Sequence, residues 1–256
     1  MAYNPQQYRA YPGAPGAAAS AAVLDAGLRA YMLRVYNWMT SGLVLTGIVA
    51  YAISHTSLIE AFFHRNAAGQ IVPTGLALVA MFAPLGFVLV LSFGINKLSR
   101  GAAQALYWAY CASVGASLTS LFITYTAQSI GSVFFVTAAT FAAMSIYGYT
   151  TRADLSRFGS FLFMGLIGII IASLVNAFFV HSGPLQMMVS IIGVLVFTGL
   201  TAFDTQRIKA DYVQYAYAYG PDDAAKRSVY DALSLYLNFI NLFMLLMNLM
   251  GNRNSN

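Results

Sequence analysis

The stretch from Phe158 to Val180 reads FGSFLFMGLIGIIIASLVNAFFV and carries no charged residue. At a rise of about 1.5 Å per residue, a helix of this length covers the roughly 30 Å hydrocarbon core of a bilayer. A helix that is apolar on every side has no face suited to water, so it must be surrounded by protein or lipid. This stretch therefore predicts a transmembrane helix.

Six further apolar runs of similar length share this character. They are rich in Leu, Ala, Gly and Phe and do not alternate polar with apolar residues, which disfavours the strands of a membrane β-barrel. We therefore predict an all-α integral membrane protein with seven transmembrane helices. The other six predicted spans are Tyr36–Ser54, Gly75–Gly94, Ala102–Thr124, Ser129–Tyr149, Leu185–Phe203 and Ala232–Met250.

The composition of the whole chain agrees with this prediction. Of 256 residues, 59% are hydrophobic and 8% are charged, against roughly 45–50% and about 25% in soluble domains. So few charges cannot cover the surface of a water-soluble protein of this size. The net charge of +5 is spread over isolated Lys and Arg residues, so it forms no basic patch for nucleic acid, and the chain is not expected to bind it.

The basic residues also predict the orientation. Most of the 13 Lys and Arg residues precede the first span or follow the second, fourth and sixth spans, and only Arg65 and Arg253 fall on the other side. Because short cytoplasmic loops carry the excess of Lys and Arg, the N-terminus should be cytoplasmic. The predicted segments are a disordered cytoplasmic tail (1–16), a juxtamembrane helix (17–35), the seven-helix domain (36–250) and a short outer tail (251–256).

Motifs for catalysis or metal binding are missing from the sequence. It has one cysteine, three separate histidines, and no HExxH, P-loop or GxSxG pattern. We therefore expect no enzymatic activity, no metal site and no cofactor.

Asp204 is the exception among the apolar spans, because it lies about one turn inside the boundary that Arg207 and Lys209 mark. Two interpretations are open. Carboxylates inside a membrane protein usually face the bundle interior and mark an ion or proton path. Alternatively, Asp204 is an interfacial residue in a salt bridge to Arg207 or to a loop charge.

The last predicted span carries a polar stripe. At 100° per residue, its polar side chains fall within an arc of about 100° on an otherwise apolar helix; they are Asp231, Ser234, Asn238, Asn241 and Asn248. Such a stripe fits a polar path through the bundle, or asparagines that hydrogen-bond neighbouring helices. Asn238 would lie roughly 10 Å into the membrane, so it could hydrogen-bond Asp204 if the two helices are neighbours.

Three segments resemble the transmembrane Bax inhibitor motif family. They are MFAPLG (81–86), GLTAFDTQ (199–206) and ALSLYLNFINLF (232–243), and the resemblance extends from about residue 30 onward. It implies six helices around a central seventh and a calcium leak that responds to pH through two aspartates. For bacterial members it also implies the cytoplasmic (inner) membrane and a link to a membrane-bound quality-control protease.

The chain departs from the family pattern at one of these aspartates. Asp204 matches the first, but Asn238 stands where the second is expected. Two carboxylates held close share a proton because both cannot be charged at short range, whereas Asn cannot ionise. We therefore expect a muted or acid-shifted pH response and weaker affinity for a hard divalent cation. Asp231, on the same stripe, is the carboxylate that could compensate in part.

Two functions follow as hypotheses. The first is a pH-responsive cation leak channel, with Asp204 as charged gate and sensor paired to Asn238, the stripe as a hydrated lining, and calcium as the permeant ion implied by the resemblance. The second is a non-conducting membrane regulator that binds a membrane-bound protease through the tail 1–16 and the loop expected after the sixth span, which carries Tyr212, Tyr215, Tyr217 and Tyr219. The partners expected from these hypotheses are the lipid bilayer, calcium ions and that protease.

Overall fold

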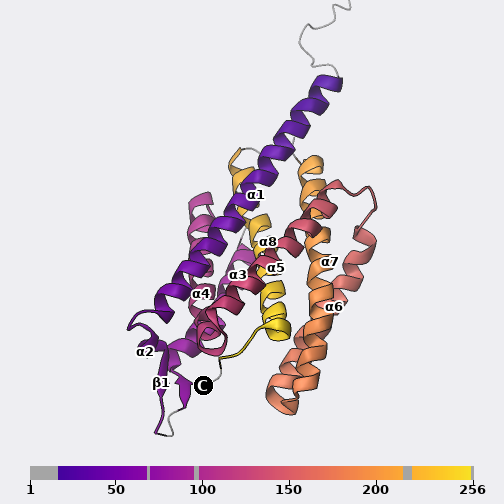
Figure 1. The fold of residues 1–256 in the computed structure, drawn as a ribbon. Helices are drawn as coiled ribbons and strands as arrows, with labels where there is room; N and C mark the ends of the chain where they lie inside the picture. The colour runs from indigo at the N-terminus through magenta and orange to yellow at the C-terminus, as the bar shows by residue number, and fades with distance from the viewer. Residues whose placement is uncertain (1–16, 68–69, 95–97, 216–220, 255–256) are drawn as a thin grey trace, which may run out of the picture.

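The computed structural model describes residues 17–67, 70–94, 98–215 and 221–254, and these are almost entirely helical (Figure 1). The elements are α1 (Ala17–Ser54), α2 (Ile59–Phe62), β1 (Phe63–Arg65), β2 (Ile71–Pro73), α3 (Gly75–Gly94), α4 (Arg100–Thr124), α5 (Ala127–Thr150), α6 (Ser156–Val175), the π-helix η2 (Asn176–Val180), α7 (Gly183–Tyr215) and α8 (Pro221–Met250). The two short strands form an antiparallel hairpin. The expected all-α membrane architecture is confirmed.

Five helical segments are long and apolar enough to cross a membrane: α4, α5, α6 with η2, α7 and α8. Helix α3 adds a shorter apolar segment, Gly75–Leu91, and its bounds are those predicted for the second span. The predicted juxtamembrane helix and first span form one uninterrupted helix, α1. The predicted tail 1–16 lies outside the described residues.

The prediction for the segment after the sixth span is wrong in one respect. Helix α7 continues well past Phe203 to Tyr215, so Tyr212 is a helical residue rather than part of a loop. Its ring stacks on Tyr31 of α1, with 4.8 Å between the ring centroids. Since no Gly or Pro occurs between Phe203 and Gly220, nothing in the sequence stops the helix where its apolar part ends. Tyr217 and Tyr219 lie outside the described residues.

Helix α8 occupies the interior of the bundle. It packs against α1, α4, α5 and α7, and Figure 1 shows it between α4 and α7. Among the five membrane-capable segments, α8 has the largest buried share. The main contacts of α3 and α6 are with α4 and α7 respectively.

Large apolar side chains cover the outside of the bundle. Phe135 of α5 is 74% exposed and Phe179 of η2 is 82% exposed, and α6 with η2 is the least buried of the membrane-capable segments. Soluble proteins rarely leave contiguous apolar patches of this extent open to water. The exterior is therefore suited to contact with acyl chains.

Close approach of α5 and α7 depends on Gly148. A Cβ at this position would overlap the backbone carbonyl oxygen of Ala202, whereas a Cβ on Gly131, in the same helix, would meet nothing within 4 Å. Because backbone cannot move aside as a flexible side chain can, we expect Gly148→Ala to cost about 1–3 kcal/mol of stability. Gly131→Ala should cost none. Thermal midpoints of the purified variants in detergent measure the difference, and equal midpoints would contradict the close packing.

Candidate functional site

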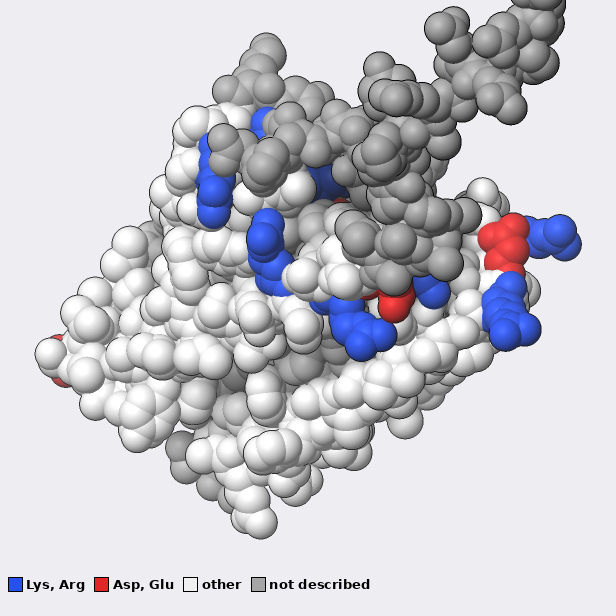
Figure 2. All heavy atoms as spheres, turned by 90° about the horizontal axis from the view of Figure 1, so that it is seen from above, with Lys and Arg blue, Asp and Glu red and all other residues white. Residues whose placement is uncertain are grey.

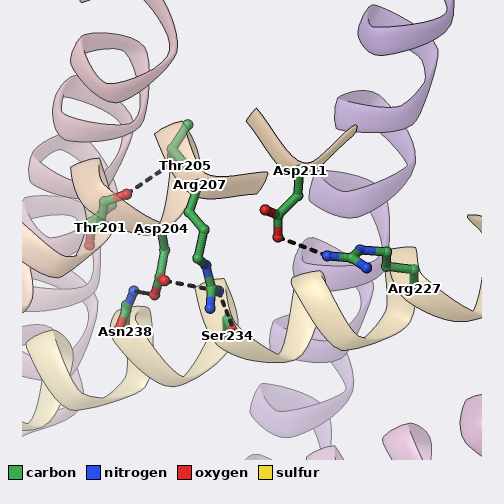
Figure 3. A network of polar contacts seen from close by, with 8 residues as sticks. All are labelled: Thr201, Asp204, Thr205, Arg207, Asp211, Arg227, Ser234 and Asn238. Carbon is green, nitrogen blue, oxygen red and sulfur yellow. Dashed lines mark hydrogen bonds and ion pairs between the residues drawn. The ribbon is translucent and has the colours of Figure 1, made fainter. Parts of the chain in front are cut away.

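Asp204 lies inside the bundle at the interface of α7 and α8, where only 7% of the residue is exposed. Its carboxylate accepts a hydrogen bond of 2.7 Å from the Asn238 side-chain amide and forms an ion pair of 2.9 Å with Arg207 (Figure 3). The contact expected between Asp204 and Asn238 is therefore present. The salt bridge to Arg207, which was the competing interpretation, is present as well.

Helix geometry explains how one carboxylate meets both partners. Asp204 and Arg207 are three residues apart on α7, so their side chains lie on the same face, and Asn238 approaches from α8. Nearby Thr201 and Thr205 donate their hydroxyl hydrogens to backbone carbonyls of α7 itself. These hydroxyls are thus satisfied locally, and the charged contact of Asp204 is left to Arg207.

Arg207 connects the site further along α8. Its guanidinium donates a hydrogen bond of 3.3 Å to the Ser234 hydroxyl, and one third of the side chain is exposed. Within the described part of the chain, Arg207 Nε is the buried side-chain nitrogen that has no hydrogen-bond partner. The guanidinium is therefore held by two partners but not fully satisfied.

Asp231 forms a second buried carboxylate site, about two turns before Asn238 on α8. The residue is 3% exposed and accepts a hydrogen bond of 2.5 Å from the Tyr31 hydroxyl of α1. Close by, Arg227 of α8 and Asp211 of α7 form an ion pair of 2.8 Å. Polar contacts thus join α1, α7 and α8 at one end of the bundle.

The sequence contained no signal for Tyr31 or for the pair of Arg227 with Asp211. Tyr31 belongs to a helix that was expected to lie before the first span, and the partners of Arg227 depend on the continuation of α7 past its apolar part. An aspartate at the start of an apolar helix is the signal that could have suggested a partner from another helix.

The predicted stripe on α8 divides into two parts. Asp231, Ser234 and Asn238 join the polar contacts described above, but Asn241 donates to the Leu237 carbonyl of its own helix at 2.8 Å. Asn248 is exposed near the far end of α8 and accepts a hydrogen bond of 3.4 Å from the Tyr125 hydroxyl. Among the described residues, the five side chains therefore do not form one continuous hydrogen-bonded path.

The chemistry available here is that of charged side chains that are buried or half-buried. Three carboxylates (Asp204, Asp211, Asp231) and two guanidinium groups (Arg207, Arg227) lie at this end of the bundle. Within residues 17–67, 70–94, 98–215 and 221–254, no three His, Cys, Asp or Glu side chains are arranged to hold a metal ion. The Asp204 carboxylate at such a site is either charged and paired with Arg207, as it is here, or protonated and neutral.

Comparison with known proteins identifies the family. The family described as "Inhibitor of apoptosis-promoting Bax1" matches residues 28–255. Inner membrane protein YbhL of Escherichia coli K12 is 48% identical over 229 residues, which cover 89% of this chain and 94% of YbhL. The uncharacterized protein RP147 of Rickettsia prowazekii is 45% identical over 230 residues, covering 90% and 92% of the two chains.

A more distant relative is similar over the same length of the chain. The uncharacterized membrane protein SpyM3_0260 of Streptococcus pyogenes is 33% identical over 228 residues, which cover 89% of this chain and 94% of the relative. The similarity thus includes the helices that carry Asp204 and Asn238. With a family match over nearly its whole length and relatives at this level of identity, the chain belongs to the Bax inhibitor-1 family and is a multi-pass protein of the bacterial inner membrane.

Proposed function

We propose that this protein is a cation leak channel of the inner membrane and that the structure represents a closed state. The observation that carries the proposal is the burial of Asp204 between α7 and α8, where it holds Asn238 and Arg207 together. An ionisable residue within a membrane helix is costly and is typical of ion or proton pathways. Calcium as the permeant ion is an inference from the family resemblance.

The proposal includes the topology. All seven long helices (α1, α3, α4, α5, α6 with η2, α7 and α8) would cross the membrane, with the other six arranged around α8 and the N-terminus in the cytoplasm. Figure 2 looks onto the end of the bundle from which α1 begins and shows Lys and Arg side chains gathered there, with few acidic ones. The positive-inside rule assigns such a face to the cytoplasm.

Gating in this proposal acts on the contacts of Asp204. In the closed state the Arg207 guanidinium is paired with the Asp204 carboxylate, so a permeant cation cannot bind to that carboxylate. Protonation of Asp204 removes the charge that positions Arg207 on the same helix, so the hydrogen bond of Arg207 to Ser234 of α8 is no longer held in place and α7 can shift relative to α8. With a single carboxylate at this position and an amide at Asn238, the response to pH should be weaker than that of a pair of carboxylates.

Flux through reconstituted liposomes that contain a calcium dye tests the proposal. The wild type should conduct, and Asp204→Asn, which preserves shape and mimics the protonated carboxyl, should raise calcium entry at neutral pH at least tenfold and remove its dependence on pH. The reason is electrostatic, because Arg207 would be left without its counter-charge. The attraction between two opposite unit charges about 4 Å apart is up to ~4 kcal/mol at an effective dielectric constant of 20.

The matched control is Asp154→Asn. Asp154 is an exposed aspartate in the connection between α5 and α6, so its replacement should leave the flux unchanged. Size-exclusion chromatography shows that each variant is folded. A folded wild type that conducts no cation, or equal flux through wild type and Asp204→Asn, would overturn the channel proposal and favour a non-conducting regulator of a membrane-bound protease.

A further inference from the structure

A long groove lies between α1 and α5, away from the polar contacts of Asp204. Its volume is about 760 Å³, within the usual range for ligand sites, and Phe239 of α8 forms part of its floor. Helices α1 and α5 both pack on α8 and supply the two walls. The groove is therefore a feature of how three helices meet, and it is open on its outer side toward the surrounding bilayer.

Each wall is a single stripe along its helix. On α1 the lining residues recur every three or four positions from Arg29 to Leu43, and on α5 they do so from Phe134 to Tyr149. Each stripe is about 21–22 Å long at 1.5 Å per residue. That length covers one leaflet of a bilayer, whose hydrocarbon half is about 15 Å thick, together with part of its headgroup layer.

The chemistry changes along the groove. One end has Arg29 on α1 and Tyr149 on α5, and the remainder is mainly apolar, with Met32, Leu43 and Phe141 among its lining. Lys209 lies at the charged end, where its ammonium donates a hydrogen bond of 2.8 Å to the Tyr149 carbonyl and sits 4.9 Å from the centre of the tyrosine ring. Arg29 is therefore the cation that lines this end of the apolar slot, and Lys209 lies next to it on Tyr149.

The ion pair of Arg29 does not close this end. Arg29 contacts Asp25 at 3.3 Å, but both side chains are largely exposed. Exposed pairs of this type contribute little and are easily exchanged for another anion. Arg29 can thus meet a phosphate without losing a strong interaction.

We propose that this groove binds one anionic phospholipid from the leaflet on the basic side of the molecule. An acyl chain would lie between α1 and α5 as far as Leu43 and Phe134, and the phosphate would lie near Arg29 and Lys209. Basic residues at this depth attract anionic lipid headgroups, and an apolar slot open to the bilayer favours hydrocarbon over water. The inference is independent of ion conduction, since the hydrogen bond and the ion pair of Asp204 are with Asn238 and Arg207, which do not line the groove.

Native mass spectrometry of the full-length protein in mild detergent tests this site. The protein is incubated with phosphatidylglycerol or with phosphatidylcholine of the same chain length, and the bound lipid is counted. We expect the wild type to retain one phosphatidylglycerol and to bind phosphatidylcholine at least fivefold more weakly. Equal retention of the two lipids would overturn the role of the cations.

Two pairs of variants separate this groove from general lipid contact. Ala142→Trp places a ring inside the groove and should reduce phosphatidylglycerol retention at least fivefold, whereas Ala143→Trp, at an exposed position of α5 that does not line it, should retain the lipid. Arg29→Gln should abolish the preference for phosphatidylglycerol, and Arg34→Gln, exposed on α1 outside the groove, should keep it. Equal retention by the two tryptophan variants, or a lipid-independent dimer that is lost only in Ala142→Trp, would overturn the proposal.

Discussion

Replacement of Arg207 by alanine should lower the free energy of unfolding by about 3 kcal/mol. Removal of one partner from a buried ion pair typically costs about 3–5 kcal/mol, because the other charge remains buried and uncompensated. The low end applies here since one third of the Arg207 side chain is exposed. Titration of the purified protein in mixed micelles with SDS measures the change.

The physical cause can be isolated with a second substitution. If the loss arises from the uncompensated Asp204 carboxylate, Asp204→Asn in the Arg207→Ala background should recover most of it, because a neutral amide needs no counter-charge. A double variant as unstable as Arg207→Ala alone would show that packing of the arginine, and not its charge, stabilises the contact between α7 and α8.

The chain contains a matched control for this experiment. Arg157 and Asp154 have the same three-residue spacing as the buried pair, but they are 3.9 Å apart and Arg157 is 85% exposed. The pKa of Asp154 lies below its ordinary value mainly because the Ser156 hydroxyl and amide donate to the carboxylate, with Arg157 contributing less. Arg157→Ala should therefore leave the stability unchanged within error.

Asn238→Asp should make both stability and flux strongly dependent on pH. The substitution replaces the amide that now lies 2.7 Å from Asp204 with a second carboxylate, and two carboxylates so close must share a proton. The folded protein then holds a proton that the unfolded chain releases, so stability falls as the pH rises, by up to about 1.4 kcal/mol per pH unit. Calcium flux should likewise change more steeply between pH 5 and 8 than in the wild type.

Asn248→Asp provides the comparison for this variant. Asn248 is exposed at the opposite end of α8, where its hydrogen bond comes from Tyr125. A carboxylate at position 248 would therefore face a tyrosine hydroxyl and not the Asp204 carboxylate. Its unfolding free energy and flux should follow the wild-type pH profile. An unchanged profile in Asn238→Asp would mean that position 238 does not act with Asp204 in any response to pH.

Several features of the site were predictable from the sequence. Asp204 stood out because it is an ionisable residue in an apolar span, and its contact with Asn238 followed from the depth of both residues at the same end of consecutive spans. Asn241 and Asn248 share the stripe with Asn238, but Asn241 donates to the backbone of α8 and Asn248 accepts from Tyr125, which lies between α4 and α5. A stripe on one helix predicts which way side chains point, and the neighbours decide what those side chains meet.

The sequence by itself determined that the chain is a helical membrane protein, because an apolar run long enough to cross the bilayer has few alternatives to a helix in lipid. It also identified Asp204 and Asn238 as a pair. Only the tertiary structure decided that Tyr31 holds Asp231 and that α1 and α5 enclose a groove ending at Arg29. The physical reason is that helices with apolar residues on both the lipid side and the protein side carry little pattern that tells which face meets which neighbour.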